Sequence, residues 1–346
     1  MRLLFITQAL DMDDPVLSAY HRLAGEASKN FDSVVALCLK KGRCELPSNV
    51  KIVSLGKEEG GNAIAKRLRY IVRFYRYVFT EKYDAVFVHM NQEYILLAGP
   101  FWKLMGKRIY MWRNHHAGSM LTDMAAAFCS KVFCTSRFSY TAKYKKSVLM
   151  PVGVDTDAFK PVSAASREPR SILFLARMAP VKKPDVLVEA LGIMNARNVA
   201  FTASFYGDPL PKDEIFYKLL QEKVAALGLG DKVRFYAGIP NDTTPRIYST
   251  HDISVNLSSS GMYDKTIFEA MGCETLIVAT NRNLKGLVND AFIAKEDDAE
   301  DVAAKIAGLI ALPALEKDAK RKDLRAIAES KHSLKALGKR LAEEVI

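Results

Sequence analysis

Ser258-Ser-Ser-Gly-Met-Tyr-Asp-Lys-Thr-Ile-Phe-Glu-Ala-Met-Gly-Cys273 is the stretch of sequence that decides the fold. An apolar run from Ile253 to Leu257 precedes it and predicts a strand. Three serines and a glycine do not continue that strand, and a helix is predicted from Asp264, followed by a second strand over Leu276–Ala279. This order of strand, small-residue turn, helix and strand is typical of a parallel α/β sheet, in which helix-start amides bind anions.

The same alternation extends outward in both directions. Strands are predicted at 2–7, 33–39, 50–55, 85–89, 108–112 and 131–135, with helices at 16–28, 63–79 and 94–104 among them. A polar, proline-flanked segment over 159–170 interrupts the pattern, which restarts at Ser171. Because 346 residues exceed what one core usually serves, we expect two doubly wound parallel-sheet domains, 1–160 and 171–330. Residues 331–346 form a C-terminal helix that either ends the second domain or returns to the first.

Cysteine content and hydropathy indicate the compartment. The five cysteines are odd in number and show neither C-x-x-C spacing nor a zinc-like cluster with histidine, so a reducing cytoplasm is expected. The apolar run from Tyr94 to Trp102 is far shorter than the ~20 residues that span a bilayer. The first residues predict a buried strand and not a signal peptide.

The net charge of +11 is concentrated in the first half. Residues 1–155 hold 23 Lys/Arg and 13 Asp/Glu, a net of +10, whereas the rest holds 27 and 26, a net of +1. The first half is therefore expected to meet an anionic partner. No nucleic-acid partner is expected, because no RNP sequence or zinc-finger motif is present.

The predicted helix over 63–79 has two distinct stripes, and each allows a different interpretation. A basic, aromatic-edged stripe is typical of a peripheral helix on an anionic membrane, here the inner face. In the alternative, the apolar stripe packs on the sheet and the basic stripe is only solvated. The basic stripe comprises Lys66, Arg69, Arg73 and Arg76, and the apolar stripe comprises Ile64, Leu68, Ile71, Tyr75, Val78 and Phe79.

Two cations follow the first predicted strand of the second domain. Arg177 comes directly off the apolar run, and Lys182 lies five residues further on, before a helix. A cation at a strand's carboxyl end and another in the next loop can clamp a diphosphate, arginine through a planar fork and lysine as a point charge. The alternative is a solvated βα loop.

Three motifs in order carry a resemblance to a known family: Gly153-Val-Asp-Thr-Asp-Ala-Phe-Lys-Pro161, Arg177-x4-Lys182 and Asp264-Lys-Thr-Ile-Phe-Glu-Ala-Met271. Together the motifs resemble glycosyltransferase family 4, the glycosyl transferases group 1, most densely from Met150 to Thr280. The resemblance implies the GT-B architecture, two Rossmann-like domains facing an interdomain cleft. It also implies a hexosyltransferase-like enzyme of glycan biosynthesis that needs no metal or cofactor. Such an enzyme moves a sugar, with retention, from a nucleotide-diphosphate co-substrate to the hydroxyl of a glycan, lipid-linked or small-molecule acceptor.

The resemblance also implies roles for individual residues. Arg177 and Lys182 would neutralise the donor diphosphate, and Glu269 would bind the ribose hydroxyls, although Thr266-x-x-Glu269 also fits a capping box. His115, after the strand at 108–112, would face the reacting sugar. Alternatively, His116 points inward, or both histidines are only a polar strand end. His89 also lies at the end of a strand. The segment expected to hold the sugar and phosphates comprises Gly261, Met262, Tyr263, Asp264, Lys265 and Thr266.

The sequence departs from the family pattern in three places. Gly261 occupies the position, eight residues before Glu269, where the family has a glutamate, so that Asp264 or loop amides replace its contact with the donor sugar, or the contact is missing. The first βα turn, Gln8–Pro15, lacks glycine, and Gly207-Asp208 stands where a second glycine is common. Gly261 motivates one alternative, a catalytically impaired nucleotide-sugar-binding relative. A GT-B epimerase or phosphorylase is a separate alternative. Asp155-Thr-Asp157 has the form of a metal motif but lies within the motif at 153–161.

Overall fold

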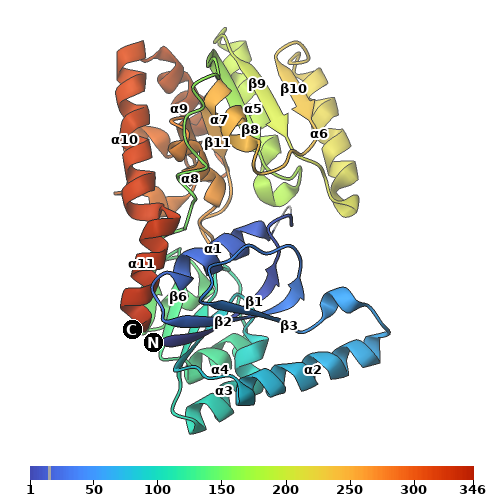
Figure 1. The fold of residues 1–346 in the computed structure, drawn as a ribbon. Coiled ribbons are helices and arrows are strands. Elements are labelled where there is room, and N and C mark those ends of the chain that lie inside the picture. Colours follow the sequence, from blue (N-terminus) through green and yellow to red (C-terminus); the bar gives the residue numbers. More distant parts are fainter. Residues whose placement is uncertain (15–16) are drawn as a thin grey trace. The chain divides into compact units, whose positions relative to one another are not determined.

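The computed structural model describes residues 1–14 and 17–346 and divides into two compact units (Figure 1). The first unit comprises Met1–Gly153 and Leu334–Ile346, and the second comprises Val154–Ser333. The domains expected from the sequence are 1–160 and 171–330, with a C-terminal helix over 331–346. The strand β8 (Glu168–Leu175) begins inside the expected linker, 159–170. In the described parts of the chain, no helix combines the length and the apolar character needed to cross a membrane.

The first unit contains a seven-stranded sheet in the order β3-β2-β1-β4-β5-β6-β7, and every pair in it is parallel. The order reverses between β1 and β4, as in a doubly wound fold. β7 has no counterpart among the sequence predictions, because three residues are too few to show a periodic pattern. The strands are β1 (Arg2–Leu10), β2 (Ser33–Lys41), β3 (Val50–Ser54), β4 (Ala85–His89), β5 (Arg108–Trp112), β6 (Lys131–Cys134) and β7 (Ser147–Leu149).

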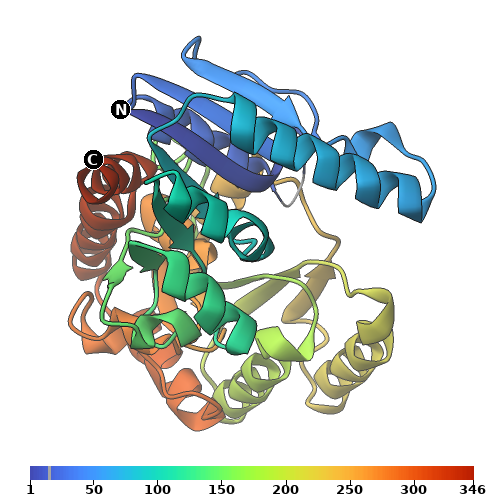
Figure 2. The same cartoon turned by 90° about the horizontal axis from the view of Figure 1, so that it is seen from below.

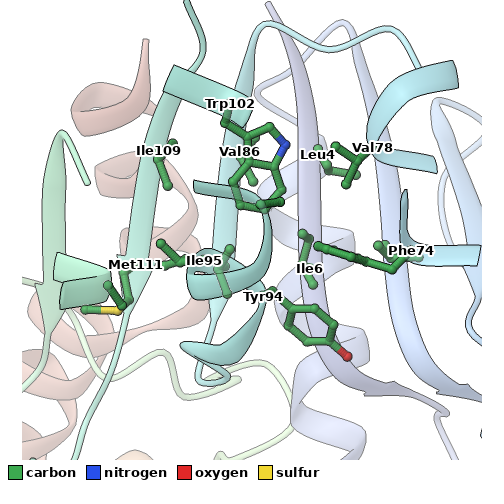
Figure 3. Packing of buried hydrophobic residues seen from close by; sticks show 14 of the residues in the cluster. Leu4, Ile6, Phe74, Val78, Val86, Tyr94, Ile95, Trp102, Ile109 and Met111 are labelled. Atoms are coloured by element: carbon green, nitrogen blue, oxygen red, sulfur yellow. The ribbon is translucent and has the colours of Figure 1, made fainter. Parts of the chain in front are cut away.

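Helices cover both faces of this sheet, and alternate strand residues point to each face. Leu4, Ile6 and Val86 point to the face covered by α2 (Ala63–Thr80), α3 (Glu93–Leu104) and α4 (Met120–Phe128) (Figure 3). Leu3 and Phe5 point to the face covered by α1 (Ser18–Ser28) and α11 (Leu334–Val345). The helix expected over 16–28 corresponds to α1, which begins at Ser18; Val16 lies outside the described residues. Two short 3-10 helices, η1 (Lys57–Glu59) and η2 (Tyr140–Lys143), complete the unit.

The alternative prediction for α2, that its apolar stripe packs on the sheet, is wrong for most of the stripe. Phe74 and Val78 are the buried residues of the helix, and they point into the cluster around Trp102 (Figure 3). Ile64, Leu68, Ile71 and Phe79 are exposed instead. The helix carries apolar residues on two neighbouring faces, so that periodicity alone did not show which face the sheet covers.

The second unit contains a five-stranded parallel sheet in the order β10-β9-β8-β11-β12. Its order reverses between β8 and β11, which makes the carboxyl ends of these two strands the expected ligand-binding edge. The other strands are β9 (Thr202–Tyr206), β10 (Val233–Tyr236), β11 (His251–Asn256) and β12 (Leu276–Ala279). The helices are α5 (Pro184–Ala196), α6 (Glu214–Ala226), α7 (Thr244–Thr250), α8 (Lys265–Gly272), α9 (Ala299–Ala311) and α10 (Ala314–His332), with η3 (Pro180–Lys182), η4 (Pro211–Asp213), η5 (Arg282–Leu284) and η6 (Asp290–Phe292).

A buried carboxylate joins α10 to the sheet of the second unit. Asp252, near the start of β11, is 2% exposed. It accepts a hydrogen bond from Lys317 Nζ at 3.0 Å and forms an ion pair with Arg321, both from α10. The Arg170 backbone N–H also donates to it at 3.1 Å. Every one of these partners is itself buried or belongs to a strand, so the network is a structural one and not a ligand site.

Candidate functional site

The candidate site lies at the carboxyl edge of the second sheet, where the loops after β8 and β11 meet at the reversal of strand order. The loop after β8 also touches the end of β9. A Cβ on Gly207 would lie 2.0 Å from the Ala176 backbone oxygen, and the φ of Gly207 is +145°, so only glycine fits there. The unexpected Gly207-Asp208 pair therefore serves close packing of the two loops. Asp208 adds a second contact, since its backbone oxygen accepts from the Met178 N–H at 3.2 Å.

Arg177 presents its side chain at this edge. Its backbone is held by the Ala179 N–H, which donates to the Arg177 oxygen at 2.9 Å. The side chain is exposed, and within residues 1–14 and 17–346 its guanidinium has no ion-pair partner. An unpaired guanidinium fork at a strand end is available for an anionic ligand.

Lys182 connects the two loops. It ends η3, and its Nζ donates to Asp264 Oδ2 at 2.5 Å and to Ser258 Oγ at 3.1 Å. Ser258 Oγ in turn donates to Asp264 Oδ2 at 3.0 Å. Lys182 and Asp264 belong to separate sequence motifs, and the structure brings them together as an ion pair across the switch point. The ammonium group is thereby fixed at the edge where Arg177 is exposed.

Asp264 stays ionised in this network. Burial raises the pKa of its carboxyl group, but the charge of Lys182 and hydrogen bonds from Lys182, Asn256 and Ser258 outweigh burial and lower the pKa to about 2. Since the pKa is lower in the folded state than in the unfolded chain, the carboxylate stabilises the fold above about pH 4. That stabilisation is lost as the pH falls toward 2.

Asp264→Asn tests this network. At pH 7 we expect the variant to lose about 1–3 kcal/mol of unfolding free energy, because the half-buried ammonium group of Lys182 loses its counter-charge. The deficit relative to the wild type should shrink as the pH falls from 4 to 2, measured by urea unfolding at each pH. Asp231→Asn, at an exposed position, controls for the loss of one acidic group. A deficit that is constant over this pH range would contradict the assignment.

Asp264 is also the N-cap of α8. Its side chain accepts from the Thr266 N–H at 3.4 Å, and Thr266 Oγ1 accepts from Asn256 Nδ2 at 2.8 Å. Thr266 is thus the second residue of the helix, so the capping box expected as an alternative for Thr266 and Glu269 is not formed. Lys265 is the first residue of the helix and is half-buried. The helix start leaves backbone amides without an intrahelical partner at the carboxyl end of β11, where an anion can bind them.

Glu269 lies one turn further along α8 and is 7% exposed. Its Oε2 accepts from the hydroxyl group of Tyr248 in α7, at a long 3.4 Å. Burial raises the pKa of the Tyr248 hydroxyl well above its ordinary value, and the charge of Glu269 adds to this. An ionised carboxylate is an acceptor only and has two oxygens, so Glu269 can accept from more than one hydroxyl group.

The loop from Ser258 to Tyr263 is held by residues that the sequence analysis missed. Asn281 Nδ2 donates to the Met262 oxygen at 2.7 Å, and Asn283 Nδ2 donates to the Ser260 oxygen at 3.0 Å. Both asparagines follow β12, whose carboxyl end adjoins that of β11, so the position after the next strand was the available signal. Tyr263 is buried against Phe268, whereas Met262 is partly exposed.

Glu296 is a third residue that the sequence did not indicate. Its Oε1 accepts from the Ser260 backbone N–H at 3.2 Å, which places a carboxylate beside the residue that precedes Gly261. Glu296 is exposed. Asp264, by contrast, is committed to Lys182 and the helix cap, so it is not available to replace the glutamate that Gly261 lacks. No sequence spacing links 296 to 261, because the contact arises from the fold.

The histidines belong to the first unit. The ring of His115 stacks on that of His116 with centroids 4.4 Å apart, and its Nδ1 accepts from the Ala117 N–H at 3.0 Å. His89 is 4% exposed, and its Nδ1 lies 3.2 Å from Thr7 Oγ1. His115 is therefore the more accessible of the two, and its expected role stays a prediction.

No metal-binding group of three or more His, Cys, Asp or Glu side chains occurs in the described part of the chain. The possible metal motif Asp155-Thr-Asp157 forms a turn instead. Asp155 Oδ1 accepts from the backbone N–H groups of Asp157 and Ala158, each at 3.2 Å. The motif shapes the backbone before Phe159, whose oxygen would lie 2.6 Å from a Cβ on Gly272 of α8.

Comparison with known sequences gives matches over part of the chain. Residues 169–311 match the family model described as "Glycosyl transferases group 1". The chain is 27% identical over 188 residues to a D-inositol 3-phosphate glycosyltransferase of Geodermatophilus obscurus, covering 50% of this chain and 42% of that protein. It is 30% identical over 153 residues to a mannosylfructose-phosphate synthase of Agrobacterium fabrum, covering 41% and 34%. The chain thus spans less than half the length of these relatives.

Solved structures match nearly the whole chain. Anabaena HepE in complex with UDP aligns with a TM-score of 0.77 at 17% identity, covering 99% of each chain. A sucrose-phosphate synthase from Thermosynechococcus elongatus aligns with a TM-score of 0.75 at 17% identity, covering 99% of this chain and 98% of that one. These matches confirm the predicted fold class, the GT-B architecture built from two Rossmann-like α/β domains.

Proposed function

We propose that this chain, whose residues 169–311 form a group 1 glycosyltransferase domain, transfers a sugar from a nucleotide-diphosphate donor to an acceptor hydroxyl group. One observation carries the proposal. The loop that carries Arg177 and Lys182 follows β8, the start of α8 follows the neighbouring strand β11, and Lys182 binds the α8 N-cap Asp264 at this switch point of one parallel sheet. Such an edge binds a diphosphate, and the similarity to HepE, solved with UDP, supports a nucleotide donor.

The proposed mechanism uses these groups on the leaving diphosphate. As the bond from the anomeric carbon to the diphosphate oxygen breaks, negative charge grows on that oxygen. Arg177, Lys182 and the amides near Lys265 and Thr266 stabilise this charge, and Glu269 accepts from the ribose hydroxyl groups. The acceptor oxygen bonds to the anomeric carbon on the face that the diphosphate leaves, and the leaving phosphate takes the acceptor's proton. In this mechanism no protein nucleophile or metal is required, and the configuration is retained. His115 faces the reacting sugar in this proposal, as the family 4 resemblance implies.

Recognition of the donor sugar is the weakest part of the family pattern here, because Gly261 has no carboxylate. We assign that contact to Glu296, together with the loop formed by Gly261, Met262 and Tyr263, since Glu296 Oε1 already binds the Ser260 N–H and the side chain is exposed. A carboxylate has two acceptor oxygens, so Glu296 can also accept from a sugar hydroxyl group.

A thermal-shift and calorimetry series tests the donor site. UDP-, GDP- and ADP-glucose are compared with UDP, GDP and ADP. The pair of ligands that carries the correct nucleobase should raise the Tm of the protein, since a ligand at 100 times its Kd adds about 2.7 kcal/mol of stability. Glu296→Gln should weaken the sugar-bearing donor about tenfold and leave the nucleoside diphosphate unchanged, because one charge-assisted hydrogen bond is lost. Glu300→Gln, in the exposed pair with Arg197, is the control. Failure of every nucleotide to bind overturns the function, whereas equal losses for both ligand types overturn only the Glu296 role.

Two alternatives are separated by one assay. Release of nucleoside diphosphate that depends on an added acceptor supports transfer. A GT-B epimerase or phosphorylase would convert the donor without an acceptor hydroxyl group. A catalytically impaired relative, which the absence of a glutamate at Gly261 motivates, would bind the donor without turnover over glycan, lipid-linked and small-molecule acceptors.

The proposed location is the cytoplasm, with peripheral contact at the inner face of the membrane. The predicted basic stripe of α2 supports this only in part. Arg69 donates to the backbone oxygens of Gly56 and Gly60 at 2.9 and 2.7 Å, and Arg73 Nη2 binds Glu59 at 3.1 Å. Arg76 is exposed and Lys66 is half-buried. Within this stripe, a purely electrostatic contact would thus depend mainly on Arg76 and Lys66.

A further inference from the structure

An apolar face on α2 is exposed, and the fold of the first unit does not account for it. The face comprises Ile64, Leu68, Ile71, Val72 and Phe79 of α2 and Phe101 of α3, whose exposed fractions range from 40% to 74%. The α2 members recur at i, i+4, i+7, i+8 and i+15, so they share one side of the helix. Single exposed apolar residues are common on protein surfaces, but a continuous stripe of this kind indicates a binding surface.

The position of α2 keeps this face away from the sheet. Phe74 and Val78 lie on the adjoining side of α2 and pack against the sheet (Figure 3). The N-terminal turns of α2 extend past the edge of the first sheet in both ribbon views (Figures 1 and 2). The ring of Phe79 packs edge-on against Phe101 with centroids 5.6 Å apart, which joins α3 to the face. The exposed apolar face therefore continues from α2 onto α3.

The charges around the face indicate its partner. Five of the 18 residues of α2 are Lys or Arg and none is Asp or Glu: Lys66, Arg67, Arg69, Arg73 and Arg76. Arg67 and Arg76 are exposed and form no ion pair within the described residues. A second copy of the chain would bring the same cations to a symmetric contact, and the like charges would repel. An anionic surface suits both the cations and the apolar stripe.

We propose that this apolar face inserts into the headgroup region of a bilayer containing anionic lipids, with Arg67 and Arg76 on the lipid phosphates. The helix would lie in the plane of the interface and would not span it, as amphipathic helices with apolar and cationic faces do. Insertion adds an apolar contribution to the electrostatic contact, so binding should persist in salt that screens charges alone. This inference does not depend on the proposed transfer reaction.

Flotation with vesicles tests the proposal on the full chain. The wild-type protein is mixed with vesicles of phosphatidylcholine alone or with about 30 mol% phosphatidylglycerol, in low and in high salt. Binding to the anionic vesicles is expected, and Leu68→Ser/Ile71→Ser/Val72→Ser should weaken it more than about tenfold, because three apolar side chains are lost from the lipid contact. The matched control is Ile215→Ser/Leu219→Ser on α6, whose residues are also exposed, at 78% and 57%.

Each outcome bears on the proposal. Since all three α2 positions are exposed, the triple variant should keep its far-UV CD spectrum and Tm, which separates lost binding from lost folding. Wild-type protein that does not float, or a triple variant that floats like the wild type, would overturn the proposal. Concentration-dependent dimers that the triple variant abolishes, in the absence of vesicle binding, would assign the face to a second copy instead.

Discussion

Arg177→Ala is expected to lower the rate of sugar transfer by about 10²–10³-fold at saturating donor and acceptor, because one donor to the growing charge on the leaving phosphate is removed. The exposed side chain has no ion pair to lose within the described residues, so the free energy of unfolding should stay close to that of the wild type. Initial rates of nucleoside diphosphate release measure the effect.

Two further variants define what Arg177 does. Arg177→Lys keeps the charge and loses the planar fork, so it should recover only part of the rate. Arg234→Ala removes an exposed arginine from β10 and should change the rate little. A rate for Arg177→Ala within a factor of two or so of the wild type would remove this residue from the proposed mechanism.

Asp252→Ala is expected to destabilise the second unit by about 3–5 kcal/mol, because Lys317 and Arg321 would lose the carboxylate to which both are bound. The two tryptophans of the chain, Trp102 and Trp112, both belong to the first unit. Tryptophan fluorescence in urea therefore reports the first unit, whereas far-UV CD reports both.

The two signals should separate in the variant. Part of the CD signal should be lost at lower urea concentration than in the wild type, and the fluorescence transition should move less. Asp231→Ala removes an exposed carboxylate of the same unit and is the control. Unchanged CD transitions in Asp252→Ala would show that α10 does not depend on this network.

Most elements of the fold follow from the sequence, because strands such as Ala85–His89 and Arg108–Trp112 are continuous apolar runs between polar turns. The face of α2 did not follow, because aromatic and aliphatic residues lie on two adjacent sides of the helix and only tertiary packing selects one. A short strand such as β7 carries no period to detect.

The candidate site shows the same division. Arg177 and Lys182 were predicted from their position after a strand, which is a local signal. The Lys182–Asp264 ion pair, the asparagines after β12 and the Glu296 contact join residues far apart in the chain. Such partners are decided by strand order, which one sequence does not contain.

The position of α11 has a consequence for the order of synthesis. Leu337, Leu341 and Val345 of this last helix cover the same face of the first sheet as α1. The ribosome completes all of the second unit, residues 154–333, before it makes α11. The nascent first unit therefore waits with one side of its sheet incompletely covered while its neighbour folds, and this is the interval in which a chaperone would be most useful to the chain.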